Sequence, residues 1–344
     1  MKFGVLQFFS WPGRRIPLAQ VYERAFDRIK LMDETGYDAV WLAEHHFSTY
    51  SVCPSVHIMG AHVAAQTKNI RIGTGISLAS FYHPLRLAEE VALLDQLTQG
   101  RVNWGAGRGF DSTEHKAFGV APEDSYPKFR ESVEVVLKAW EDGSFSHKGK
   151  YFEYEDIEVL PKPYQKDMPV WIGATSEGSI EWAAQKGLSI LLGPHSSHQD
   201  SYEKREFFRA KLEGAGHVFE GRDIPLTRSV AIGETDEAGY ELGRRGAEFM
   251  FGNYMKNKGN IRGGEQAAAE GKTQSSDAVL AAERENVNPI ERYVNEVALC
   301  GSPEKVIDDI ERLRETNKID YLMIAPLGHE SFIRFTEKVM PHFQ

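Results

Sequence analysis

The chain has 344 residues, of which 41% are hydrophobic and 26% charged, the balance of an ordinary globular protein. Its formal net charge of -10 argues against nucleic acid as the main partner, because such binding depends on Lys and Arg neutralising phosphates. No apolar run approaches the roughly 20 residues that cross a bilayer, and the first residues carry no signal-peptide pattern, so we expect a cytoplasmic protein without a membrane partner.

Short apolar or β-branched runs alternate with helical patterns along almost the whole chain, which is typical of a parallel sheet built from βα units. Eight strands are predicted, at 3–8, 39–42, 70–77, 102–106, 170–174, 189–192, 226–233 and 321–325. Apolar stripes at helical spacing lie between them, including Val21, Ala25, Ile29 and Met32. The series predicts a (β/α)8 TIM barrel formed by one domain, residues 1–344, although a doubly wound open sheet stays possible because periodicity does not show closure.

A barrel of this kind needs about 250 residues, so the chain should carry insertions. One is predicted at 145–160, where alternating residues favour a hairpin. The other is 255–288, which is rich in Gly, Lys, Glu, Gln and Ser and poor in large apolar residues. That composition fits either a flexible lid beside a site or a disordered surface loop.

The candidate site is expected where the strands end, since barrels of this type place their sites at the carboxyl ends of the strands. Directly after the second strand stand Glu44, His45 and His46. Burying such groups costs free energy unless they are paired or used, and His titrates near neutral pH, so the segment indicates proton transfer.

Two later segments indicate an anion site. Thr175 and Ser176 begin a predicted helix, whose free N–H groups suit phosphate, and Arg108 would add a charged contact. Alone, Ser176 would be an ordinary N-cap and Arg108 a solvated surface charge. Their occurrence at the ends of adjacent strands favours phosphate binding. The glycines at 105–109 do not form a dinucleotide fingerprint, because the third one comes a position too early.

A metal site is not expected, although five histidines crowd into one stretch, at 45, 46, 57, 62 and 83. Neighbouring residues of a strand point to opposite faces, so His45 and His46 would not readily share a metal, and no His-Glu-x-x-His pattern occurs. Cys53 and Cys300 are far apart and outside any Cys-x-x-Cys spacing, which fits two inert thiols in a reducing compartment.

Together, EHHF at 44–47, GTGI at 73–76, HPLRLAEE at 83–90 and GAGRG at 105–109 resemble the bacterial luciferase-like flavin-dependent monooxygenases. The resemblance covers most of the chain and is weakest over 196–288. It implies a barrel that receives reduced FMN (FMNH2) from a separate flavin reductase. There O2 would react through a flavin hydroperoxide to oxygenate a small organic substrate. By analogy with the family we also expect a homodimer.

The same resemblance implies roles for single residues. His45 matches the catalytic His and would remove or return the hydroperoxide proton. The bond between Gly75 and Ile76 matches a non-proline cis peptide under the flavin ring. The cofactor-binding positions that it implies are Glu44, Gly75, Ile76, Gly107, Arg108, Tyr126, Thr175, Ser176 and Ser179. Apolar walls that would keep the flavin dry are expected from Phe8, Phe47, Trp104 and Phe110.

The chain departs from the luciferase α subunit at several positions. That subunit has a reactive Cys where Gly107 stands, a second phosphate Arg near Tyr126 and a Trp near Pro194, so we do not expect light emission. The family also contains barrels that use a deazaflavin for hydride transfer, and flavin-binding relatives without catalysis. Both alternatives stay open, and the apolar walls do not define one substrate.

Overall fold

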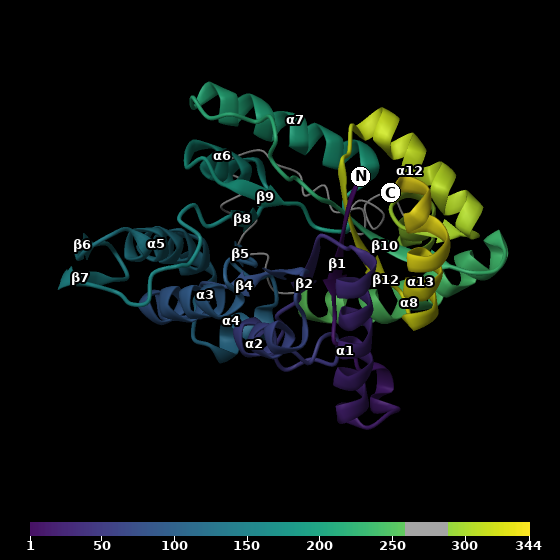
Figure 1. Ribbon diagram of the computed structural model, residues 1–344, viewed down its shortest axis with the longest axis horizontal. Helices are drawn as coiled ribbons and strands as arrows, with labels where there is room; N and C mark the ends of the chain where they lie inside the picture. The colour runs from purple at the N-terminus through teal and green to yellow at the C-terminus, as the bar shows by residue number, and fades with distance from the viewer. Residues whose placement is uncertain (259–287) are drawn as a thin grey trace.

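The computed structural model describes residues 1–258 and 288–344. Its main feature is a largely parallel sheet in the order β11-β10-β12-β1-β2-β3-β5-β8-β9, with β4 paired to β5 (Figure 1). The predicted strands are all present, as β1 (Lys2–Gln7), β2 (Ala39–Leu42), β3 (Arg71–Thr74) with β4 (Ser77–Leu78), β5 (Val102–Gly107), β8 (Val170–Gly173), β9 (Ser189–Leu191), β10 (Leu226–Ile232) and β12 (Tyr321–Pro326).

The sheet curls so that strands far apart in its order meet across an apolar interior. The ring of Trp41 on β2 lies 5.1 Å from that of Trp171 on β8, edge to face, although β3 and β5 separate these strands in the sheet. Leu6, Leu191 and Met323 belong to the same buried cluster. Side chains from strands on both sides of the curled sheet therefore fill its concave face, as side chains fill the interior of a barrel.

The closed (β/α)8 barrel that the alternation predicts is not completed. Among the described strands no ladder joins β9 to β10, which closure would need. Instead β11 (Leu299–Gly301), which was not predicted, takes an edge of β10 through the pairs Val230 to Leu299 and Ile232 to Gly301. The fold is thus a curled parallel half-barrel. The edge strand β9 has only three residues, which leaves little backbone for a further ladder.

Helices cover the outer face of the sheet (Figure 1). They are α1 (Leu18–Thr35), α2 (Val56–Gln66), α3 (Pro84–Thr98), α4 (Ser112–Ala117), α5 (Pro122–Trp140), α6 (Glu177–Gln185), α7 (His198–Gly214), α8 (Asp236–Lys258), α11 (Pro289–Glu296), α12 (Pro303–Asn317) and α13 (His329–Arg334). The stripe predicted on α1 is confirmed, since Val21, Ala25, Ile29 and Met32 are its buried residues. No helix of the described ranges is long and apolar enough to cross a membrane.

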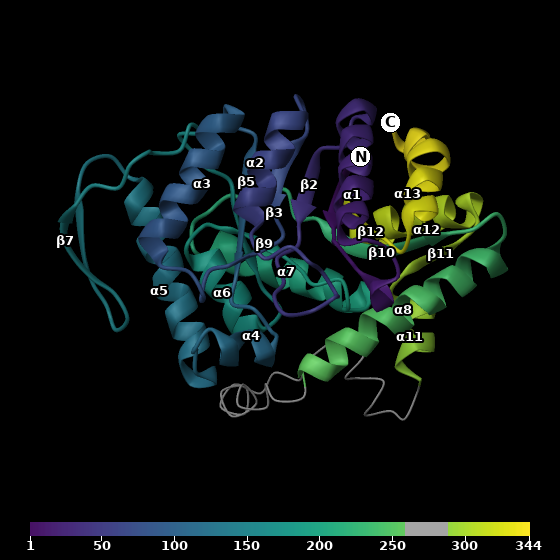
Figure 2. The same ribbon diagram turned by 90° about the horizontal axis from the view of Figure 1, so that it is seen from below.

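The structure describes the predicted insertion at 145–160 in full and the one at 255–288 only at its ends. The segment 145–160 forms the antiparallel hairpin of β6 (Phe145–Lys148) and β7 (Glu153–Ile157), which projects from the body of the molecule (Figure 2). The expected lid, 255–288, lies outside the described residues except at its ends. Its first four residues complete α8, and Asn288 caps α11 through hydrogen bonds from the backbone of Ile290 and Glu291.

Candidate active site

His45 follows β2, and its imidazole is surrounded by three aromatic rings and the carboxylate of Glu114. Its Nδ1 lies 3.4 Å from Oε1 of Glu114, and only 11% of its side chain is exposed. The ring stacks on Phe8 with centroids 6.3 Å apart, while Tyr50 and Phe110 meet it edge to face. Two of the expected apolar walls, Phe8 and Phe110, thus lie beside the imidazole. Its neighbours shield it from water on several sides, which suits controlled proton transfer.

Glu114, on α4, is a site residue that sequence reasoning missed. Its side chain is 1% exposed, and its Oε1 accepts a 2.8 Å hydrogen bond from the backbone N–H of His46 as well as facing His45. A buried carboxylate behind a histidine fixes the orientation of the ring. The spacing of Glu114 from the N-cap Asp111 is that of a capping box, but its carboxylate binds the backbone of His46 instead, so no local signal marked it as a site residue.

Glu44 and His46 contact each other, and Glu44 also binds the backbone of β4. The carboxylate of Glu44 is buried and accepts hydrogen bonds from Tyr82 Oη at 3.0 Å and from the backbone N–H of Leu78 at 3.3 Å. Nε2 of His46 lies 3.1 Å from the same carboxylate. His45 and His46 contact different carboxylates, those of Glu114 and Glu44, but both lie after β2 and line the same cavity. Glu44 lies next to the predicted flavin segment, holding its backbone.

The predicted cis peptide is present between Gly75 and Ile76. Ile76 lies over two glycines of neighbouring strands: a β-carbon at Gly107 would overlap its Cδ1, and one at Gly173 would lie 3.3 Å from the same atom. A β-carbon on Gly75 would lie 2.9 Å from Leu6, so position 75 also has no room for a side chain. These three glycines and Ile76 form one close-packed floor.

A buried chain of hydrogen-bond contacts, from Ser77 through His57 to Glu90, supports this floor. Oγ of Ser77, directly after Ile76, lies 3.0 Å from Nε2 of His57, whose Nδ1 lies 3.1 Å from Glu90. His57 holds the pKa of the Glu90 carboxyl below its usual range, with a further contribution from Arg86. His57 is a buried residue of α2 that links Glu90 on α3 to the floor.

Arg108 and Tyr126 meet at the next strand end. Nη1 of Arg108 donates to Oγ of Ser125 at 3.1 Å, and burial lowers the pKa of the guanidinium while the Tyr126 hydroxyl opposes that shift. Arg108 bears no carboxylate partner in residues 1–258 and 288–344. Burying a cation without an acid beside it costs free energy.

Arg130, one helical turn beyond Tyr126 on α5, was not predicted. Its Nη2 donates to Tyr126 Oη at 2.9 Å and to the carbonyl of Gly178 at 2.8 Å, and its guanidinium lies 4.3 Å over the Tyr126 ring. Its Nε is buried without a hydrogen-bond partner in the described part of the chain. Arg130 therefore carries a spare donor at the start of α6. The luciferase α subunit has a second phosphate Arg near position 126, and because this chain has Tyr126 there, the sequence was interpreted as lacking it; Arg130 was therefore overlooked.

The start of α6 completes the group. Ser176 is its N-cap, and Ser176 and Ser179 form a capping box in which each side chain accepts from the other's backbone N–H, at 3.3 and 3.1 Å. The ordinary N-cap role of Ser176 is thus real. Thr175 and Ser176 are exposed, so the first turn stays open to a ligand. The structure brings Arg108, Tyr126 and Ser176 to one place, with Arg130 joining them.

The remaining predicted residues, two aromatic walls and two cysteines, lie away from the Arg108 group, although Phe47 lines the cavity beside His45. Trp104 is fully buried between sheet and helices, where its ring meets Trp140 at 5.0 Å, so it is core and not a wall of the site. Phe47 is 66% exposed. Burial raises the pKa of both Cys53 and Cys300 to about 12, which keeps the thiols protonated and unreactive. Within the described ranges, no three His, Cys, Asp or Glu side chains are arranged to hold a metal ion.

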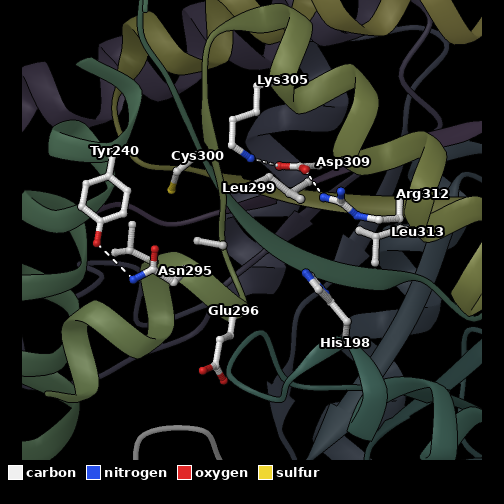
Figure 3. Close-up of a pocket in the computed structure, with 12 residues that line it drawn as sticks. His198, Tyr240, Asn295, Glu296, Leu299, Cys300, Lys305, Asp309, Arg312 and Leu313 are labelled. Atoms are coloured by element: carbon white, nitrogen blue, oxygen red, sulfur yellow. Dashed lines mark hydrogen bonds and ion pairs between the residues drawn. The ribbon is translucent and has the colours of Figure 1, made fainter. Parts of the chain in front are cut away.

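A cavity of about 600 Å³ is lined by His45, His46 and Phe47, by residues of the loops after β1 and β2, and by residues of α1, α4 and α8; none of the Arg108 group lines it. A second cavity, of about 180 Å³, lies between α11, β11 and α12 (Figure 3). There Lys305 and Arg312 both bind Asp309, which leaves their charges paired. No predicted site residue lines this second cavity.

Residues 1–317 match the sequence profile of the family described as luciferase-like monooxygenase. The chain belongs to this family. As a luciferase-like monooxygenase it is an enzyme of the flavin-dependent monooxygenase class, and the predicted resemblance is confirmed.

Curated relatives agree along the whole length. The alkanal monooxygenase alpha chain of Photobacterium leiognathi is 28% identical over 340 residues, which cover 94% of each chain. The oxygenase component of the flavin-dependent trigonelline monooxygenase of Acinetobacter baylyi is 26% identical over 355 residues, covering 100% of this chain and 96% of the relative.

Solved structures share the fold. Monooxygenase RslO1 of Streptomyces bottropensis has a TM-score of 0.83 at 24% identity, with full coverage of both chains. The oxygenating constituent of 3,6-diketocamphane monooxygenase of Pseudomonas putida, in complex with FMN, has 0.78 at 21%, covering 99% and 98%. The coenzyme F420 dependent tetrahydromethanopterin reductase of Methanopyrus kandleri has 0.71 at 18%, covering 100% and 99%. At these identities the likeness concerns the fold alone.

Proposed function

We propose that this luciferase-like monooxygenase uses reduced FMN and O2 to oxygenate a small organic substrate, with the reduced flavin supplied by a separate reductase. The observation that carries the proposal is the meeting of Arg108, Arg130 and the open first turn of α6 beside the floor of Ile76 and Gly107. Bound reduced FMN supplies the electrons that activate O2 for transfer of one oxygen atom.

The residues fit the FMN phosphate. Arg130 has a buried Nε without a partner in the described chain, and Arg108 is a half-buried cation without an acid. The exposed first turn of α6 adds a favourable helix dipole, although the N–H groups of Ser176 and Ser179 already bond each other's side chains. We assign Arg108, Arg130, Thr175, Ser176 and Ser179 to the phosphate, with Tyr126 holding Arg130 in place.

The isoalloxazine ring of the flavin would lie on the floor formed by Ile76 and the three glycines. Gly75, Gly107 and Gly173 offer no side chains, and Ile76 fills the space between the last two. Glu44 holds the segment from the side through the backbone of Leu78. Close approach of a planar ring to backbone is what such glycines permit.

His45 would handle the proton. Its imidazole is flanked by Phe8 and Phe110 and faces the buried carboxylate of Glu114. Glu114 orients the ring, so that one nitrogen stays available for the proton of the reacting oxygen. The aromatic neighbours exclude water that would release the oxygen as hydrogen peroxide.

Isotope labelling tests this function. The protein is supplied with FMN, NADH, a flavin reductase and a panel of aldehydes, ketones, sulfur compounds and aromatic compounds under ¹⁸O₂. Incorporation of one ¹⁸O atom into a product is expected. Flavin-dependent oxygen uptake that yields only hydrogen peroxide with the entire panel would count against oxygenation of these substrate classes.

A deazaflavin-dependent oxidoreductase is the alternative, supported by the fold shared with the F420 dependent reductase. It predicts selective binding of the deazaflavin over FMN and substrate oxidation without O2. A flavin carrier, in contrast, would bind oxidised flavin and consume no oxygen when reduced. Comparing the three readouts on one preparation separates these functions.

We also propose a homodimer. Ile58 on α2 and Leu93 and Leu97 on α3 are 77%, 49% and 63% exposed, an apolar group on two helices that pack side by side. Exposed apolar side chains gathered in this way mark interfaces. Leu97→Glu is expected to shift the protein to monomer in sedimentation velocity, while Leu160→Glu, at an exposed residue elsewhere, should not.

A further inference from the structure

The cavity beside His45 is distinct from the Arg108 group and has its own chemistry. It has a volume of about 600 Å³, within the range of sites for small organic molecules. Trp11, Tyr22 and Phe47 supply aromatic surface to its wall, and Ser48, Thr49 and Thr113 supply hydroxyl groups. His45 is part of the same wall. A molecule in this cavity would therefore lie against the imidazole.

Among the residues that line the cavity, Asp111 is a carboxylate and Arg14 is the cation. No carboxylate of residues 1–258 or 288–344 forms an ion pair with it, and its guanidinium lies 5.5 Å over the Trp11 ring. The carboxylates nearby are already engaged: Asp111 accepts from the N–H of Thr113 at 2.7 Å, and Glu114 faces His45. The cavity thus combines the unpaired cation of Arg14 with neutral donors and with the hydrogen-bonded carboxylate of Asp111.

The backbone conformation and exposure of Phe47 are a second observation that indicates a ligand in this cavity. Phe47 adopts a positive φ of 56°, which few residues other than glycine take, and its ring is 66% exposed at the cavity. Phe118 lies 5.5 Å from it and is also partly exposed. An aromatic ring left in water next to a free guanidinium is covered best by a molecule that is itself apolar and negatively charged.

We infer that the substrate of this enzyme is an aromatic carboxylate, whose anionic group binds Arg14 and whose ring lies among Trp11, Tyr22 and Phe47 beside His45. The inference rests on the proposed function, because it places the substrate next to the proposed proton-transfer residue. A guanidinium binds a carboxylate through two parallel hydrogen bonds, and this geometry sets the direction in which the ring enters.

Equilibrium binding to the whole protein without flavin tests the inference. Isothermal titration calorimetry with benzoate, benzamide and acetate at fixed ionic strength separates charge from aromatic surface. Benzoate should bind at least ten-fold more tightly than benzamide, which has the same shape and no charge, and at least ten-fold more tightly than acetate. Equal affinities for benzoate and benzamide, or no benzoate binding below about 10 mM, would overturn the inference.

Variants locate the binding. Arg14→Gln should remove the preference for benzoate over benzamide, whereas Arg15→Gln, which changes the same charge in the same turn but does not line the cavity, should retain it. A preference that survives Arg14→Gln, or is lost equally in both variants, contradicts the assignment. Circular dichroism checks that both variants fold.

Failure of this inference is distinguishable from failure of the proposed function. If the protein binds reduced FMN and consumes O2 but shows no benzoate preference, only the substrate class is wrong. If benzoate binds through Arg14 but reduced FMN does not bind, the proposed function fails and the anion site stands alone.

Discussion

The side chain of Ile76 occupies the space in which any side chain at position 107 would lie. A β-carbon built on Gly107 overlaps Cδ1 of Ile76, which reaches across from the cis peptide after β3 to the end of β5. The luciferase α subunit has a reactive Cys at the matching position. In this chain the packing of Ile76 leaves no room for such a thiol.

Gly107→Ala should therefore displace Ile76. Overpacking of this kind costs about 1 to 3 kcal/mol of the free energy of unfolding. Urea unfolding measures the loss, and FMN titration should show weaker binding because the floor is distorted. The double variant Gly107→Ala/Ile76→Ala removes the clash and should recover part of the FMN affinity. A single variant with unchanged stability and affinity would show that Ile76 moves freely.

Arg108→Ala and Arg130→Ala should weaken FMN binding while leaving riboflavin binding nearly unchanged, because riboflavin lacks the phosphate. Each loss is expected at about 1.5 to 3 kcal/mol, the range for hydrogen bonds to charged groups. Fluorescence titration with both flavins measures the difference. Arg205→Ala, at a cation on α7 paired with Glu206, is the control. Equal losses for FMN and riboflavin would place the phosphate elsewhere.

Glu114→Gln keeps an acceptor for the backbone of His46 but removes the charge that faces His45. The expected result is normal FMN affinity with a larger share of oxygen released as hydrogen peroxide. His45→Ala should give the same effect more strongly. Peroxide assays run alongside oxygen uptake measure the coupling. Full coupling in His45→Ala would remove this histidine from the mechanism.

Stability should depend on pH through His198. Burial lowers its pKa to about 3, helped by Arg228 and Arg312, and its Nδ1 accepts a 3.0 Å hydrogen bond from Arg228. In the unfolded chain a histidine titrates near 6.5, so between these values only the unfolded state binds the proton. The contribution to stability is full above pH 6.5 and falls as the pH drops toward 3, by at most about 1.4 kcal/mol per pH unit.

Urea unfolding at several pH values between 7 and 5 tests this dependence. In His198→Asn the side-chain oxygen can still accept from Arg228 without titrating, so the decline should be shallower than in the wild type. The pKa of His115 is also lowered by burial, so some decline should persist in the variant. Identical slopes in both proteins would contradict the role of His198.

Local sequence patterns predicted the strands and the helix stripes because each depends on residues close in the chain. The buried face of α1 and the hairpin of β6 and β7 are examples. Closure of the barrel depends on contacts between distant segments, and so does the pairing of β11 with β10. The closed barrel was therefore the wrong expectation for a curled sheet.

Site residues that lie in sequence motifs were predicted. Site residues that only the packing of distant segments brings together were not. His45, Gly75 and Arg108 lie in motifs at strand ends. Glu114 lies 68 residues from His46, to whose backbone it binds, and Arg130 reaches Gly178 across 48 residues. Such pairs depend on how α4 and α5 pack, and a local sequence pattern does not predict this packing.

Anaerobic titration with reduced FMN tests the proposed function most directly. The wild-type protein should bind reduced FMN with a dissociation constant well below 1 mM, and the Arg108→Ala variant should bind it at least ten-fold more weakly, the minimum that loss of a charged hydrogen bond implies. No binding of reduced FMN by the folded wild-type protein below the millimolar range would contradict the function proposed for this chain.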